Sequence, residues 1–62
     1  MDIEEFPLLY ADPHAQELAW QMTQEQPELG PIVESMARHP GVISQPQLAI
    51  YSLMRIQEIY RK

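Results

Sequence analysis

The last third of the chain, residues 44–62, has the apolar spacing of an amphipathic α-helix. One set of side chains recurs at i, i+4, i+7 and i+11 and therefore shares a helix face: Ala49, Leu53, Ile56 and Tyr60. A second set widens this face on both sides: Leu48 and Ile59 on one, Ile50 and Met54 on the other. The apolar arc then covers more than half of the circumference, whereas a surface helix needs about 100°. The pattern predicts a helix over 45–61 with unusually extensive apolar surface.

The length of the chain makes this surface difficult to cover. A chain of 62 residues forms one domain at most, and it buries only about 60% of the surface that its unfolded form exposes. Small proteins of this size usually depend on disulfides, a metal, a partner or very good helix packing. The sequence has no cysteine, which excludes disulfides and thiolate metal sites. We therefore expect the excess apolar surface to be covered by the rest of the chain, a second copy or another protein.

The same composition bears on localisation. The absence of cysteine suits a reducing compartment. No apolar run approaches the ~20 residues that span a bilayer, and the N-terminus lacks the basic and apolar regions of a signal peptide. The sequence predicts a cytoplasmic protein that does not associate with membranes.

Helix boundaries are marked by prolines. Asp12 can cap a helix whose first residue is Pro13, because proline loses no needed donor there. We expect this helix over 13–26, with an inward stripe formed by Ala15, Leu18, Ala19 and Met22. Pro27 is expected to begin a single turn.

Pro31 similarly begins a second expected helix, 31–39, with Ile32, Val33, Met36 and Ala37 inward. Arg38 and His39 suit the negative C-terminal end of its dipole, and Pro40-Gly41 is expected to stop it. Val42 and Ile43 are interpreted as loop residues between helices. Ser44 and Gln47 form a capping box for the last helix. The fold class predicted is all-α: a small three-helix domain over residues 1–62.

The N-terminal residues 1–11 are expected to form an extended arm. Pro7 disfavours a helix there. Five large apolar side chains argue against disorder: Ile3, Phe6, Leu8, Leu9 and Tyr10. Such an arm would lie across a helix, over its own core or in a neighbour.

Charge is distributed unevenly along the chain. Residues 1–34 carry eight carboxylates and no Lys or Arg, a charge of −8, whereas residues 35–62 carry +3, which together give −5. This balance disfavours a nucleic-acid ligand, because the phosphate backbone requires clustered cations. The acidic half is interpreted as a solvated surface, as a face steering towards a basic partner, or as a region that docks beside the basic C-terminus.

No catalytic or metal motif emerges. Ser35, Ser44, His14 and His39 can be combined with carboxylates on paper, but catalysis needs a concave pocket, and three short helices rarely enclose one. The two histidines are 25 positions apart without a thiol nearby, which disfavours zinc. Each glycine adjoins a proline, so no phosphate loop is expected. The sequence predicts no enzyme, no cofactor and no small-molecule substrate.

Residues Ala37-Arg38-His39-Pro40-Gly41-Val42-Ile43-Ser44, followed by Gln47-Leu48, resemble the turn between the first two helices of the winged-helix effector domain of response regulators. The resemblance covers about a dozen residues and implies a helix–turn–helix geometry. No recognition helix or wing follows within the 62 residues, and the basic surface of that family is absent.

These observations favour a non-enzymatic interaction module: an adaptor, assembly factor or inhibitor that binds a partner protein, or itself as a homodimer, through the C-terminal helix. The alternatives are an acidic mimic of nucleic acid that inhibits a basic target site, and a minimal helix–turn–helix DNA-binding regulator. Leu53 and Ile56 are assigned to the core. Arg55 can form an i, i+3 ion pair with Glu58, but an ordinary solvated face is favoured at this side of the helix. The predicted partner-binding residues are Trp20, Ile50, Tyr51, Met54 and Arg55, with Phe6 and Tyr10 in reserve.

Overall fold

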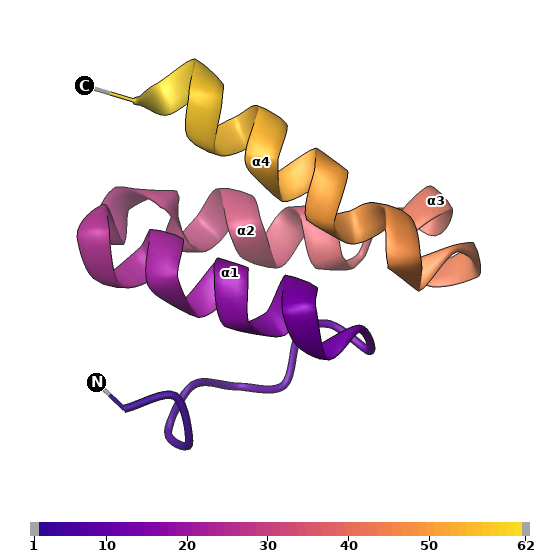
Figure 1. The fold of residues 1–62 in the computed structure, drawn as a ribbon, viewed down its shortest axis with the longest axis horizontal. Coiled ribbons are helices and arrows are strands. Elements are labelled where there is room, and N and C mark those ends of the chain that lie inside the picture. Colours follow the sequence, from indigo (N-terminus) through magenta and orange to yellow (C-terminus); the bar gives the residue numbers. More distant parts are fainter. Residues whose placement is uncertain (1, 62) are drawn as a thin grey trace.

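Six helical segments follow one another in the computed structural model, which describes residues 2–61 (Figure 1). The longer helices are α1 (Pro13–Glu25), α2 (Gly30–Ala37) and α4 (Ala49–Tyr60). The shorter segments are the 3₁₀ turns η1 (Pro27–Leu29) and η2 (Pro46–Leu48) and the five-residue helix α3 (Pro40–Ser44). The described residues contain no strand. The predicted all-α class and its three main helices are therefore confirmed.

The start of α1 follows from its capping residues. Asp12 Oδ1 accepts a hydrogen bond from the His14 amide at 3.1 Å, and Pro13 is the first helical residue. The side chains of Ala15, Ala19 and Met22 are buried, whereas Leu18 is partly buried against the same core. Both the cap and the inward stripe were predicted correctly, because both depend on local sequence signals.

One four-residue pattern occurs twice before a helix. Gln26-Pro27-Glu28-Leu29 and Gln45-Pro46-Gln47-Leu48 each place glutamine at the N-cap position of a 3₁₀ turn that leads directly into an α-helix. The backbone at Gln26 (φ −136°, ψ 86°) closely matches that at Gln45 (φ −134°, ψ 75°). The turn at Pro27 was expected, whereas its repetition at Pro46 was not.

The region between α2 and α4 corrects several expectations. The second helix ends at Ala37 rather than residue 39, and Pro40 begins α3 where a loop was predicted. His39 does not continue the preceding helix, because its Nδ1 accepts a hydrogen bond from the Gly41 amide at 3.1 Å and caps α3. Val42 is buried, whereas Ile43 is 65% exposed, so only one of them fills the gap between helices.

The predicted capping box is also wrong. Ser44 is the last residue of α3, and its hydroxyl donates to the Gly41 carbonyl at 3.3 Å. The N-cap position of η2 is Gln45, which makes no side-chain capping bond. The last α-helix consequently begins at Ala49, after the 3₁₀ turn, instead of at residue 45.

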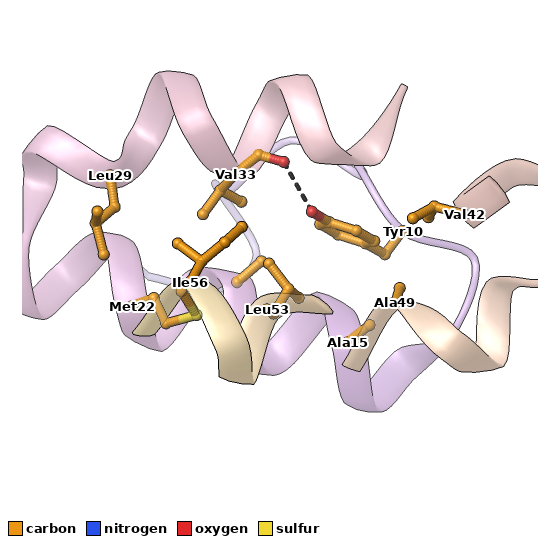
Figure 2. Close-up of a cluster of buried hydrophobic side chains, with 10 residues drawn as sticks. Tyr10, Ala15, Met22, Leu29, Val33, Val42, Ala49, Leu53 and Ile56 are labelled. Atoms are coloured by element: carbon orange, nitrogen blue, oxygen red, sulfur yellow. Dashed lines mark hydrogen bonds between the residues drawn. The ribbon is translucent and has the colours of Figure 1, made fainter. Parts of the chain in front are cut away.

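The three longer helices enclose the core. Figure 1 shows α1 and α4 running in the same direction and α2 running in the opposite one. From α4 the buried residues are Ala49, Leu53 and Ile56, which face Ala15 and Met22 of α1 and Val33 of α2 (Figure 2). The core cluster consists of Tyr10, Ala15, Ala19, Met22, Leu29, Val33, Val42, Ala49, Leu53 and Ile56. Small residues on α1 allow the helices to approach closely, which suits so short a chain.

The arm folds back over the helices and is held by one side chain. Residues 3–6 form turns, and residues 7–10 have no regular secondary structure. Gln16 Oε1 on α1 accepts hydrogen bonds from the Leu9 and Tyr10 amides, both at 3.0 Å. Its Nε2 donates to the Pro7 carbonyl at 2.9 Å. The arm therefore lies across α1, as predicted, and the side chain of Gln16 holds it there. Residues 3–6 form turns instead of the extended chain expected over 1–11, and residue 1 lies outside the described residues.

We expect Gln16→Ala to release the arm. Three hydrogen bonds of about 0.5–1.5 kcal/mol each are lost, so the free energy of unfolding should fall by about 2 kcal/mol in urea titrations. Hydrogen exchange at the Leu9 and Tyr10 amides should accelerate as well. The control is Gln21→Ala, the same change on an exposed residue of α1, which should alter stability by less than about 0.5 kcal/mol. Equal effects of the two variants would show that the clamp contributes nothing.

Candidate functional site

The side of α4 that points away from the core is rich in exposed apolar groups. Tyr51 is 68% exposed, Ile59 65%, Met54 52% and Leu48, just before the helix, 43%. Single exposed apolar side chains are ordinary on protein surfaces, whereas a group on one helix face forms a patch. Two exposed charged residues complete this surface, here named the α4 outer face: Leu48, Tyr51, Met54, Arg55, Glu58 and Ile59.

The repeated turns show that Leu48 occupies an unusual environment. Leu29 and Leu48 are the last residues of η1 and η2, and each precedes an α-helix. Leu29 is fully buried in the core, whereas Leu48 is 43% exposed. The same local structure therefore directs one leucine inward and leaves the other on the α4 outer face.

The structure divides the predicted partner-binding residues into two groups. Tyr51, Met54 and Arg55 lie together on the α4 outer face, and Ile50 is half-buried beside it. Phe6 belongs to the arm and is partly buried against the core, and Trp20 lies half-buried on α1.

Tyr10 is a core residue and not an accessible anchor. It is 3% exposed, and its hydroxyl donates a hydrogen bond to the Val33 carbonyl at 2.7 Å (Figure 2). Burial raises the pKa of Tyr10 from 10.0 to about 12, because the phenolate would lose its solvation. The prediction that Tyr10 binds a partner is therefore wrong: its side chain links the arm to α2.

Two details of α4 also differ from expectation. Tyr60, assigned to the apolar core face, is 46% exposed, since it lies in the last turn, where Gln26 Nε2 donates to its carbonyl at 2.9 Å. The Tyr60 ring therefore lies at the C-terminal end of α4 and is not covered by the core. The ion pair that the spacing of Arg55 and Glu58 allows is not formed; within the described residues, an i, i+4 pair joins Arg38 to Glu34 at 2.8 Å.

An apolar cleft of about 170 Å³ lies between the arm and α3. It is lined by Leu9, Tyr10, Ala11, Ala37, Val42, Ile43 and Pro46. Because the cleft combines three separate segments, no spacing in the sequence could reveal it. Small-molecule sites usually measure ~300–1,000 Å³, so this cleft fits an aliphatic side chain better than a substrate.

Two wider clefts lie at other places on the surface. One of about 350 Å³ is lined by Glu25, Gln26, Gln57 and Arg61, where the acidic and basic halves of the chain meet. The other, of about 260 Å³, is lined by Met36, His39, Gly41, Val42, Leu48 and Ser52. Neither brings a serine, a histidine and a carboxylate together.

Polar chemistry at these surfaces is sparse. Among residues 2–61, no three His, Cys, Asp or Glu side chains gather closely enough to hold a metal ion. Over the same part of the chain, every buried side-chain nitrogen or oxygen has a hydrogen-bond partner. The turn that resembles a helix–turn–helix contains α3, and its Arg38 is paired with Glu34.

Comparison with known proteins gives no family assignment. No protein-family model matches the chain, and no curated protein or solved structure is similar enough to count as a match. Of the helices between residues 2 and 61, none has the length and apolarity that crossing a membrane requires. The class defined by fold and surface is therefore a small all-α protein with an exposed apolar helix face.

Proposed function

We propose that this chain is a non-enzymatic protein-interaction module that binds a partner protein through the α4 outer face. The observation that supports this function is the exposure of Leu48, Tyr51, Met54 and Ile59 around the part of the α4 surface that is not buried in the core. The core already uses Ala49, Leu53 and Ile56, so exposing four further apolar groups does not serve folding. Covering them with another protein surface would remove them from water.

The types of residue on the α4 outer face suit recognition. Tyrosine, methionine and arginine are enriched at protein interfaces, and tyrosine and arginine are frequent among the residues that dominate binding energy. Arg55 and Glu58 lie among the apolar groups and supply charges that distinguish partners. An adaptor, an assembly factor or an inhibitor would each use such a surface.

A second candidate function uses the acidic half of the chain. Asp2, Glu4, Glu5, Glu17 and Glu25 are all exposed, and residues 2–34 contain no Lys or Arg. This surface favours an acidic mimic that occupies a basic nucleic-acid site on a target protein.

Site-specific photo-crosslinking in the native source separates the two functions. Benzoylphenylalanine at position 51 probes the α4 outer face, and the same group in place of Glu17, exposed on α1, is the matched control. We expect an adduct from position 51 that Met54→Asp abolishes, because a charge then enters the apolar contact. Excess unmodified chain should compete away an adduct to a different protein, whereas an adduct to a second copy should have twice the mass of the chain.

The opposite result is equally informative. An adduct from position 17 and none from position 51 would favour the acidic mimic. The absence of any adduct from position 51, whether to a different protein or to a second copy of the chain, would contradict binding through the α4 outer face.

A further inference from the structure

We infer that the α4 outer face is occupied by the same face of a second copy of this chain, with the two α4 helices antiparallel about a two-fold axis. This inference rests on the proposed function and names its partner. Figure 1 shows α4 at one edge of the molecule, with α1 and α2 on its other side. The C-terminal part of α4 is therefore accessible to a second α4.

The α4 outer face is a part of the surface where charge does not oppose a second copy. The chain carries −5 overall, so two copies repel each other through most of their surfaces. The α4 outer face holds one cation, Arg55, and one anion, Glu58, and is neutral. These two residues form no ion pair with each other in the single chain. Each is therefore available to a charge on a second molecule.

The spacing of the residues is self-complementary. A two-fold axis that crosses α4 between positions 56 and 57 places Arg55 opposite Glu58 of the second copy, and the symmetry makes this contact twice. The same axis places Met54 opposite Ile59 of the second copy, also twice. Both apolar side chains are more than half exposed in the single chain, so the two apolar contacts bury them on either side of the two ion pairs.

The antiparallel orientation follows from helix electrostatics. Parallel helices would align their dipoles and bring their negative ends together, whereas antiparallel helices place each positive end beside a negative one. A parallel pair would also put Arg61 of both copies at the same end of the dimer. Opposed helices separate these charges.

A charge-reversal series tests this arrangement. Sedimentation equilibrium at low salt should show wild-type chain passing from 7.2 kDa to twice that mass as concentration rises through the micromolar range. Arg55→Glu and Glu58→Arg each place like charges opposite one another and should weaken association at least tenfold. The double variant Arg55→Glu/Glu58→Arg restores opposite charges and should associate within about threefold of wild type. Circular dichroism verifies that each variant is folded.

The control for the charge-reversal series is a charge change away from α4. Glu17→Arg makes the same charge change as Glu58→Arg on exposed α1 and should not weaken association, because it lowers the net negative charge. A double variant as weak as either single one would overturn the pairing. A wild-type chain that stays monomeric, yet gives a competed adduct to a different protein from position 51, would overturn the second copy and leave the proposed function standing. Loss of both dimer and adduct would overturn the two together.

Discussion

Leu53→Asp is expected to unfold the chain, whereas Met54→Asp, the adjacent substitution on the same helix, leaves it folded. Leu53 is fully buried and Met54 is 52% exposed. The change at Leu53 removes a core side chain and places a carboxylate in an apolar environment, which together cost at least about 4 kcal/mol. A core of this size supplies only about 3–5 kcal/mol of net stability. The variant therefore has almost no folded population.

Circular dichroism and the fluorescence of Trp20, the only tryptophan, measure this loss. The far-ultraviolet signal of Leu53→Asp should match that of the urea-unfolded wild type, and its urea titration should show no cooperative transition. Met54→Asp should shift the free energy of unfolding by less than about 0.5 kcal/mol. Ile50→Asp, at a half-buried position, should be intermediate. If Leu53→Asp and Met54→Asp were equally stable, the assignment of the two helix faces would be wrong.

The parts of the fold predicted from sequence are those set by short-range chemistry. Asp12-Pro13 caps and begins α1 through contacts within four residues, and the buried spacing of Ala49, Leu53 and Ile56 follows the helical period. Such signals require no knowledge of the remainder of the chain.

The wrongly predicted loop at residues 40–44 results from the two possible effects of Pro40 on helix formation. A proline both disfavours helix in the residue before it and suits the first turn of a new helix. At Pro13 the second effect was recognised, whereas at Pro40 only the first was. The structure shows the same arrangement at both places: Asp12 and His39 each cap a helix whose first residue is proline. The accepting atom at position 39 is a histidine nitrogen, which is a less familiar cap than a carboxylate.

The candidate site could be predicted only in part, because exposure depends on long-range packing. The spacing identified a broad apolar arc on α4, but whether Met54 or Tyr60 faces the core depends on where α1 and α2 lie. Tyr10 was similarly placed among accessible residues, since nothing near it in sequence shows that Gln16 holds the arm or that Val33 accepts its hydroxyl. These hydrogen bonds join residues that are 6 to 23 positions apart, and contacts of this kind produce no periodic pattern in the sequence.

The buried phenol of Tyr10 predicts a loss of stability at alkaline pH. Its pKa is about 12 in the folded chain against 10.0 when unperturbed, so folding favours the neutral phenol. The stabilisation is fully present below pH 10 and disappears as the pH rises through 12, because the unfolded chain releases the proton first. Two pKa units correspond to about 2.7 kcal/mol, which is a large part of the stability of a chain this small.

Tyr10→Phe provides the comparison that isolates this effect. The variant loses the hydrogen bond to Val33, at a cost of about 1 kcal/mol, but has no phenol to ionise at position 10. Urea titrations from pH 8 to 12 should therefore show wild type losing about 1.4 kcal/mol per pH unit between 10 and 12 relative to Tyr10→Phe. The other tyrosines, Lys and Arg are common to both chains and cancel in the difference. Parallel pH profiles for the two chains would mean that the Tyr10 hydroxyl reaches water in the folded state, and that the arm does not seal the core.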